Sequence, residues 1–366
     1  VREGGTVKRI AYNSYRFKDA RTAETVGGET WGGRSRVGNT TTGNEITVSS
    51  GTHTEVYGGW TRGASSQTAT ADKGNSTYNK VTVNGSAAVS GTVYGGFTNV
   101  ANGKATNNEV HLNGVTVASV YGGSGGTANE NEVHLDGVTV TWTVHGGHTE
   151  GGTANENKVH LSGGEVRGDV FGGDGLTAND NVVSLSNGAT VTGDVYGGNA
   201  ATTNNNIVNI DRATVTGTIR GGEDGSTGNT LNVAGTNSAR QIAGFQRVNF
   251  DATGVAAGAP MLNLNGSAGT TLDRGAIDAT GSTVNGGITL LHNANGITVN
   301  GLAADDNILK SETDATTEKN IAVHRTGGNI TDIRYEGYQF AGVTTPVIIG
   351  TDAYGGISKA GNATHT

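Results

Sequence analysis

The fold is decided by residues 144–161, which read Val-His-Gly-Gly-His-Thr-Glu-Gly-Gly-Thr-Ala-Asn-Glu-Asn-Lys-Val-His-Leu. The stretch opens with an apolar residue, a planar residue and two glycines, and it closes with the alternating run Val159-His160-Leu161. Alternation of apolar and polar residues is typical of a strand with one buried face. Glycine and asparagine tolerate positive φ, so the pieces between the two runs are predicted to be turns. The stretch therefore predicts two short strands joined by a bend.

The same cassette recurs throughout 31–235, at intervals of 26, 37, 27, 24, 26, 25 and 24 residues. The longest interval carries a Ser-, Thr- and Ala-rich insertion around Ala64–Tyr78, which we expect to be an exposed loop. A strand-turn cassette of about 25 residues, repeated eight times, is typical of the coils of a parallel β-solenoid. The planar residues that begin the cassettes are Trp31, Tyr57, Tyr94, Tyr121, His145, Phe171, Tyr196 and Arg220.

Stacked coils would place equivalent residues in columns along the solenoid axis, with about 4.8 Å between neighbouring residues of one column. The residue before each planar side chain is β-branched from the second cassette onward, as a packed strand face prefers, and should form an inner column. Asparagines at the turns would add ladders of amide hydrogen bonds. Helix is disfavoured, since Gly- and Thr-rich cassettes have poor helix propensity. The predicted inner column is Val56, Val93, Val120, Val144, Val170, Val195 and Ile219.

A longer repeat underlies the cassettes. Shifted by 323 positions, residues 1–43 align without a gap on residues 324–366, with 15 identities in 43 positions. This predicts one long unit of a tandem array and the start of the next. Strand-like pieces continue beyond the regular cassettes, as at Ile321–Val323, Ile330–Phe340 and Val347–Ile349, and are predicted to be irregular coils of the same solenoid. The expected divisions are the end of a preceding unit at 1–30, regular coils at 31–244, irregular coils at 245–350 and the next unit from 351 to 366.

Composition narrows the class of protein. Glycine is 63 of 366 residues and charged residues are only 15%, which suits a narrow solenoid core. The net charge of −8, with no basic run, argues against nucleic acid as a partner. No stretch approaches the roughly 20 apolar residues needed to span a bilayer, so no membrane contact is predicted for this segment. Cysteine is absent, which favours a protein that crosses an outer membrane unfolded, where a premature disulfide would block transport.

The cassette Gly193-Asp194-Val195-Tyr196-Gly197-Gly198, followed by Asn-rich turns, resembles the passenger domains of large autotransporter adhesins of Gram-negative bacteria. The stretches Ile242–Phe250, Leu262–Leu264 and Ile288–Leu291 are similar to the irregular coils of those passengers. The resemblance covers nearly the whole chain. It implies an all-β, right-handed parallel β-helix, an extracellular location at the cell surface with a tether to the outer membrane, and a role in adhesion or aggregation.

The eight planar residues are the candidate binding residues. If the preceding residue points inward, the planar side chain points outward, and flat groups at about 4.8 Å spacing can stack. Two interpretations follow, and both can hold for one stripe. Stacked side chains can shield the sheet and fix its register, which is the interpretation we favour, or they can form a stripe that binds a sugar or a protein.

His111, His134 and His160 occupy equivalent cassette positions, with Glu109 and Glu132 nearby. Aligned imidazoles suggest Zn²⁺ or Ni²⁺, but ligands on a flat stack do not converge tetrahedrally. An exposed polar position is therefore favoured, with mutual repulsion of the rings once they are protonated near pH 6. No metal or cofactor is predicted.

Three further patterns are weighed and set aside. Gly122-Gly123-Ser124-Gly125-Gly126 matches a nucleophile-elbow pattern, yet Ser124 is predicted to lie at a turn rather than before a helix. Residues 172–177 approach a calcium-binding loop, with Thr177 where the aspartate should stand. Polysaccharide cleavage needs two carboxylates in fixed proximity, and the candidates are Asp169 with Asp194, and Asp305 with Asp306. We predict no enzyme activity and no catalytic residues.

The sequence thus predicts a structural and adhesive module of an extracellular tandem-repeat surface protein. Its partners would be a host or bacterial surface glycan or protein, or copies of itself end to end. The first alternative is a self-assembling extracellular filament or sheath protein, and the second is a polysaccharide-processing β-helix enzyme.

Overall fold

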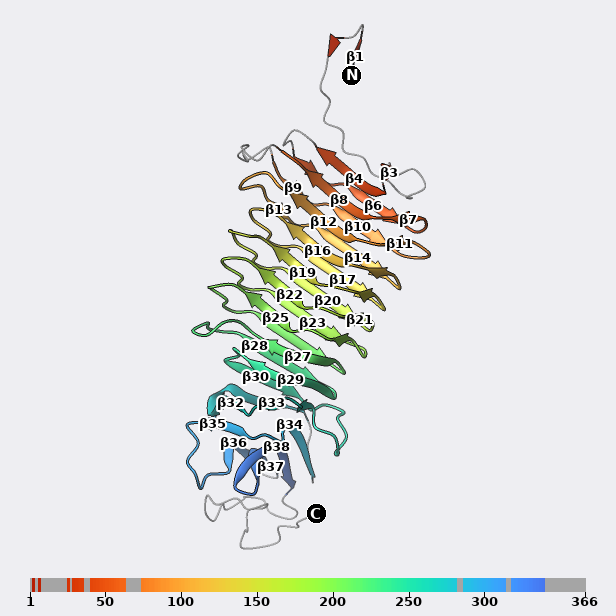
Figure 1. The fold of residues 1–366 in the computed structure, drawn as a ribbon. Helices are drawn as coiled ribbons and strands as arrows, with labels where there is room; N and C mark the ends of the chain where they lie inside the picture. The colour runs from red at the N-terminus through yellow and green to blue at the C-terminus, as the bar shows by residue number, and fades with distance from the viewer. Residues whose placement is uncertain are drawn as a thin grey trace.

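A computed structural model describes residues 28–35, 40–63, 74–281, 286–313 and 317–339, together with the backbone of the short strands β1 (Arg2–Glu3), β2 (Thr6–Val7) and β3 (Thr25–Val26). The chain is a parallel β-solenoid of about 10 turns, with roughly 26 residues per turn. Figure 1 shows an elongated rod whose coils follow one another in sequence order from the N-terminal to the C-terminal end. The predicted fold class is confirmed.

One face of the rod is a parallel sheet of ten strands, each taken from a successive coil. The first eight of these strands are the alternating runs of the cassettes, and the last two follow at 247–251 and 277–280. Burial alternates as predicted in all but the last of these strands. They are β6 (Glu45–Val48), β10 (Lys80–Val83), β14 (Glu109–Asn113), β17 (Glu132–Asp136), β20 (Lys158–Ser162), β23 (Val182–Ser186), β26 (Ile207–Asp211), β28 (Thr230–Ala234), β30 (Arg247–Asp251) and β33 (Ile277–Thr280).

A second face carries the planar-Gly-Gly segments and pairs in parallel from coil to coil. Its strands are β4 (Glu29–Ser35), β8 (Glu55–Thr61), β12 (Thr92–Thr98), β16 (Ser119–Ser124), β19 (Val144–His148), β22 (Val170–Asp174), β25 (Val195–Asn199), β27 (Thr214–Arg220), β29 (Asn237–Ala243), β31 (Leu262–Leu264) and β34 (Gly286–Asn293).

Short strands complete each coil. Between the two main faces lie β7 (Thr52–His53), β11 (Ala88–Val89), β15 (Thr116–Val117), β18 (Thr139–Val140), β21 (Glu165–Val166) and β24 (Thr190–Val191). At the Asn-rich bend lie β5 (Thr41–Thr42), β9 (Ser76–Thr77) and β13 (Ala105–Thr106), and later coils add the parallel pair β32 (Thr270–Asp273) and β35 (Ile297–Asn300). Within the described ranges the only helical turn is a 3-10 turn at Arg274–Ala276, and no helix there is long and apolar enough to cross a bilayer.

The core is a set of columns running along the rod axis. The predicted inner column from Val56 to Ile219 is confirmed, since all seven members are fully buried and pair in register from coil to coil. Opposite it, the ten-stranded sheet contributes buried valines and leucines such as Val159 and Leu161. A narrow core of β-branched side chains therefore substitutes for the broad core of a globular domain.

A ladder of eight buried asparagines lines the bend between the two main faces. In each step the side-chain amide and the backbone N–H of one asparagine donate to Oδ1 of the next, as when Asn131 donates to Asn157 at 3.0 Å from both groups. Gln246 Oε1 accepts the last backbone N–H, from Asn229, at 2.9 Å. The ladder consists of Asn44, Asn79, Asn108, Asn131, Asn157, Asn181, Asn206 and Asn229. The predicted amide ladder at the turns is confirmed.

The local sequence explains this bend. The residue before each ladder asparagine has positive φ, as at Glu156 with φ 57°, so the chain turns sharply at one position. Both glycines of the planar-Gly-Gly segment face the ladder. A Cβ on Gly146 would lie 2.9 Å from Asn157 Cβ, and one on Gly147 would lie 2.6 Å from Asn157 Nδ2. The glycine pair therefore provides the space that the asparagine side chain occupies.

The C-terminal end of the described chain departs from the solenoid. Two pieces were predicted as further irregular coils, Ile321–Val323 and Ile330–Phe340. The first, and the second as far as residue 339, belong to two long strands, β37 (Thr317–Thr326) and β38 (Asn329–Gln339), which pair antiparallel. Strand β38 also pairs antiparallel with β34, and β36 (Ile308–Thr313) with β37. The prediction of continued coiling was wrong here, because the tight turn at Gly327 and Gly328 makes a hairpin instead of a crossover.

Several predictions fall outside the described residues. They are the unit that starts at 351–366, the strand at Val347–Ile349, most of the junction at 1–30, and most of the insertion around Ala64–Tyr78.

Candidate binding surface

The planar residues form a continuous stack on the outer side of the second face. Neighbouring ring centroids from Tyr57 to Tyr196 lie 4.9, 5.1, 4.6, 4.6 and 4.8 Å apart, with interplanar angles of 15° or less. At the ends of the stack, Trp31 lies against Trp60 at 6.0 Å and the Arg220 guanidinium lies 5.9 Å from the Tyr196 ring. The predicted stacking is confirmed for this run of cassettes.

The stack is less exposed than the sequence suggested. Trp31, Tyr57, His145 and Phe171 are only 5–9% exposed, whereas Tyr94, Tyr121, Tyr196 and Arg220 are half-buried. The rings of Tyr94, Tyr121, His145 and Phe171 are each covered on both faces by rings of the neighbouring coils. The expectation of a fully outward stripe is therefore corrected, because the column offers ring edges and hydroxyl groups to solvent rather than ring faces.

A second column lies beside the first, formed by the residue after each Gly-Gly pair. The sequence analysis predicted that Ser124 lies at a turn. In the structure, Ser124 and its equivalents lie at or near the ends of the strands of the second face. Here Phe97 lies 5.2 Å from Tyr94, and the Arg34 guanidinium lies over Trp31 at 3.9 Å and over Trp60 at 4.3 Å. The column consists of Arg34, Trp60, Phe97, Ser124, His148, Asp174 and Asn199.

The character of this surface changes along the rod. Near the N-terminal end, Tyr57 donates a hydrogen bond to Glu55 at 2.6 Å, and burial raises the pKa of Tyr94 to about 12. Near the other end, Asp194 accepts a hydrogen bond from Tyr196 at 3.2 Å and lies 3.6 Å from Arg240. The surface is therefore mainly aromatic near the N-terminal end of the rod and carries paired charges around Asp194.

The ten-stranded sheet presents a separate polar column. His111, His134 and His160 pair in register as predicted, and their rings stack at 4.6 and 4.9 Å. The same column continues in both directions with half-buried polar residues. Its ten members are Thr47, Thr82, His111, His134, His160, Ser184, Asn209, Asn232, Asn249 and Asp278.

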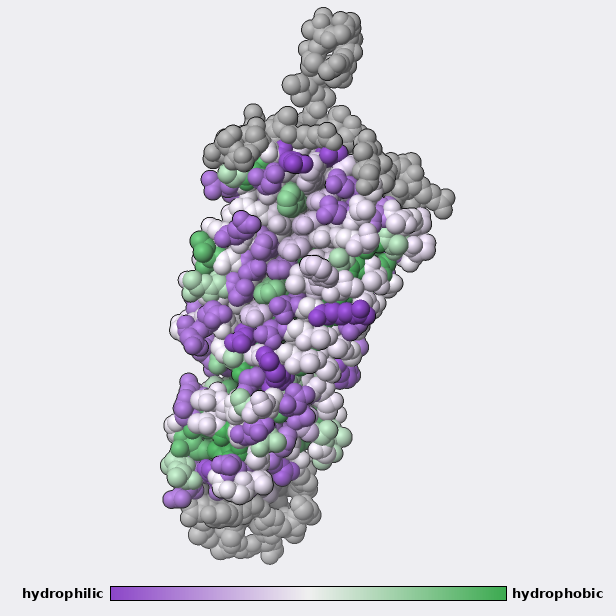
Figure 2. All heavy atoms as spheres, in the orientation of Figure 1, coloured by the Kyte–Doolittle hydropathy of each residue, from purple (hydrophilic) through white to green (hydrophobic). Residues whose placement is uncertain are grey.

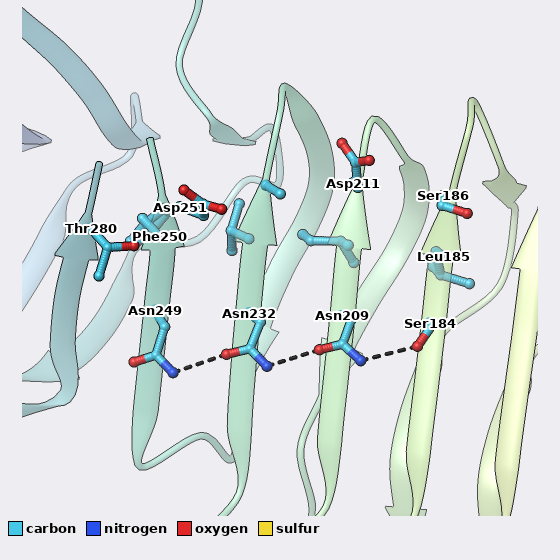
Figure 3. A pocket seen from close by; sticks show the side chains of 13 residues that line it. Ser184, Leu185, Ser186, Asn209, Asp211, Asn232, Asn249, Phe250, Asp251 and Thr280 are labelled. Carbon is cyan, nitrogen blue, oxygen red and sulfur yellow. Dashed lines mark hydrogen bonds between the residues drawn. The ribbon is translucent and has the colours of Figure 1, made fainter. Parts of the chain in front are cut away.

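The C-terminal half of this column borders a shallow trough of about 430 Å³. Figure 3 shows its ladder of side chains, in which Asn249 donates to Asn232 at 2.9 Å, Asn232 to Asn209 at 2.8 Å, and Asn209 to Ser184 at 3.0 Å. Asp211 and Asp251 also line the trough. On the face shown in Figure 2, hydrophilic residues cover much of the rod and hydrophobic residues occur in small separate groups.

Two clusters among the described residues bring three metal-ligand atoms within 4.8 Å of one another. The first is Glu132, His134 and His160, which belongs to the histidine column. The second is His145, His148 and Asp174, which joins the two outer columns. The sequence patterns did not single out the second cluster, although the spacing of one coil between His148 and Asp174 could have suggested it.

The other residues weighed as catalytic take part in turns. Asp169 Oδ1 accepts the Asp194 backbone N–H at 2.7 Å, and Asp194 Oδ1 accepts the Thr218 backbone N–H at 2.7 Å. Asp306 accepts the Ile308 backbone N–H at 3.0 Å and pairs with Arg274 at 2.9 Å, near Asp305 in a turn. Asp169, Asp194 and Asp306 thus each link neighbouring coils, which is a structural role that their positions explain.

The exposed aromatic residue Trp142 was not predicted to be a functional residue from the sequence. Trp142 is 69% exposed at a bend, where the equivalent residues of the neighbouring coils are Ala118 and Gly168. A large side chain at a position otherwise held by small residues was the available signal.

No family model matches the chain, and no curated protein or solved structure gives a significant match to it. The fold and these surfaces define the class, a parallel β-solenoid with columns of stacked side chains on two faces.

Proposed function

We propose that the chain is a structural and adhesive module of an extracellular tandem-repeat protein tethered to the outer membrane of a Gram-negative bacterium. It acts through many weak contacts with host or neighbouring cells. The observation that carries this proposal is the register of equivalent outer residues, in which ten polar positions on one face and eight planar positions on another repeat from coil to coil. The 323-residue sequence repeat would extend the same pattern along an array.

The outer columns suit contacts with glycans or with polar protein surfaces. Half-buried Tyr94, Tyr121 and Tyr196 present ring edges, and the amides of Asn209 and Asn232 lie along an open trough. Each such contact is weak on its own. Repetition converts later contacts into intramolecular ones, so that avidity can exceed the affinity of one site by about 10²–10⁴-fold.

A self-assembling filament is the second candidate, and one observation favours it. Among the described residues, β6 pairs only with β10, so it forms the edge of the ten-stranded sheet. A sheet edge presents backbone donors and acceptors to another chain. End-to-end stacking of units would follow from pairing at that edge.

The test compares the chain in free form with the chain displayed on beads at increasing density, bound to epithelial cells and to bacterial cells. We expect weak binding of the free chain and adhesion of beads that rises steeply with density. The triple variant Tyr94→Phe, Tyr121→Phe, Tyr196→Phe removes the hydroxyl groups and keeps the stack, since phenylalanine already occupies this column at Phe171. The double variant Asn209→Ser, Asn232→Ser removes two amides from the trough and replaces them with serine, which the same column already contains at Ser184.

Both variants should fold like the wild type and weaken adhesion of the beads. Dense wild-type beads that adhere no better than albumin-coated beads would contradict the adhesive role. Growth of filaments with protein concentration, without adhesion to cells, would favour the filament instead.

A further inference from the structure

Three potential metal ligands meet on the outer side of the second face. His145 and His148 come from β19, and Asp174 comes from β22 in the next coil, where it pairs in register with His148. Nδ1 of His148 lies 2.9 Å from Asp174 Oδ2, and Nδ1 of His145 lies 3.6 Å from the same oxygen. The site therefore joins two neighbouring coils at one carboxylate oxygen.

His145 is an unusual member of the planar column. It is 5% exposed, and its Nδ1 atom is buried without a hydrogen-bond partner. Burial lowers the pKa of this imidazole, with the nearby His148 as a further cause. This buried nitrogen has no hydrogen-bond partner, and it faces a carboxylate and a second imidazole. A bound cation would satisfy it.

The surroundings hold the three ligands in place. The His145 ring is sandwiched between Tyr121 and Phe171, with both centroids 4.6 Å away. Asn199 donates a hydrogen bond to Asp174 Oδ1 at 2.9 Å, which leaves Oδ2 directed toward the two histidines. Partners of this kind fix ring and carboxylate orientation around metal ions.

We propose that His145 Nδ1, His148 Nδ1 and Asp174 Oδ2 bind one Zn²⁺ ion, with a fourth position open to water or to a group from a partner. In a tetrahedral zinc site with bonds of about 2.0–2.1 Å, neighbouring ligand atoms lie about 3.3–3.4 Å apart. The distances of 2.9 and 3.6 Å from Asp174 Oδ2 bracket that value. Two imidazoles and one carboxylate are a ligand set that zinc accepts.

The cluster of Glu132, His134 and His160 is the weaker candidate. Its three side chains are 34–38% exposed, so water reaches their polar atoms. Lys158 pairs in register with Glu132 and adds a positive charge beside the carboxylate. The site at His145 is favoured because it contains the buried nitrogen without a partner.

The test is a zinc titration of the purified full chain, without a polyhistidine tag and after treatment with a chelator, by isothermal titration calorimetry. Two variants remove a ligand with a residue that the same column already contains. His145→Phe follows Phe171, and Asp174→Asn follows Asn199. His160→Ser, which follows Ser184, is the matched control at the other cluster. Circular dichroism confirms that each variant keeps the fold.

The wild type and His160→Ser are expected to bind one Zn²⁺ per chain with equal affinity. His145→Phe and Asp174→Asn should each weaken binding by at least about 100-fold, more than loss of a supporting residue usually costs. The proposal is overturned if the wild type binds no zinc, if either folded ligand variant binds as tightly as the wild type, or if His160→Ser alone loses binding. These results do not depend on whether the chain adheres to cells.

Discussion

Replacement of Asn157 by alanine is expected to lower the free energy of unfolding by about 3–5 kcal/mol. This residue lies in the middle of the buried amide ladder. Its Oδ1 accepts the backbone N–H and the side-chain amide of Asn131, both at 3.0 Å, and its Nδ2 donates to Asn181 at 3.1 Å.

The magnitude follows from counting these groups. Loss of three hydrogen bonds costs roughly 1 kcal/mol each. The buried backbone N–H of Asn131 also loses its side-chain acceptor, which adds a desolvation penalty of about 1–3 kcal/mol. Two groups keep a partner, because Asn131 Nδ2 still donates to Ala105 O and Asn181 Oδ1 still accepts the backbone N–H of residue 157. These remaining bonds lower the sum of about 4–6 kcal/mol by roughly 1 kcal/mol, to about 3–5 kcal/mol.

The assay is urea unfolding followed by circular dichroism at pH 7. Asn157→Asp keeps the shape of the side chain but places a buried charge against Asn181 Oδ1, so it should cost at least as much as alanine. Asn113→Ala is the control, because Asn113 is exposed and donates only a long bond of 3.4 Å to Asp136. A loss under about 1 kcal/mol for Asn157→Ala, or a loss equal to that of Asn113→Ala, would refute the reasoning.

Three further changes test other parts of the account. Val170→Asp places a charge at a fully buried position and should cost several kcal/mol, roughly 4 or more, so an unchanged melting temperature would show that Val170 does not face the core. Gly147→Ala should destabilise by about 1–3 kcal/mol because its Cβ would clash with the backbone oxygen of Ala128 and with the side chain of Asn157, whereas Gly151→Ala, where a Cβ meets open space, should be neutral in the same thermal melt. Burial, and then the charge of His134, lowers the pKa of His160 in the folded chain, with Glu132 opposing and Lys158 adding to the shift. The unfolded chain therefore binds the proton more readily, and stability should be full above about pH 6.5 and fall as pH drops below it. The stability is measured as the midpoint of urea unfolding at pH 7 and at pH 5, and His160→Ser should reduce the difference between the two midpoints. An unchanged difference would contradict the role given to His160.

Much of the solenoid could be predicted from the sequence because its signals are local. Alternating residues such as Val159-His160-Leu161 define which side faces the core, and a fixed cassette length brings equivalent positions into register. The amide ladder followed from the same spacing. The reason for the Gly-Gly pair could not be predicted from the sequence, because only the structure shows that both Gly146 and Gly147 face the side chain of Asn157.

The antiparallel pairing of β37 with β38 has the same alternation as a parallel strand, but the pair Gly327-Gly328 between them is a local hairpin signal that the sequence analysis did not use. Other features depend on contacts that no local pattern encodes. The burial of Tyr57 and Phe171 depends on rings from neighbouring coils. The cluster of His145, His148 and Asp174 joins residues from two cassettes: the one-coil spacing of His148 and Asp174 points to their proximity, but only the structure shows all three ligand atoms together.

We propose that the chain is one unit of a long adhesive solenoid, and electron microscopy of the native protein that carries it tests this proposal most simply. About 10 coils at about 4.8 Å each span roughly 50 Å, and the C-terminal antiparallel strands add to that length, so the 323-residue period predicts an axial repeat on the order of 60 Å along a thin fibre. A fibre with that repeat would support the account. A compact particle without an axial repeat would contradict it.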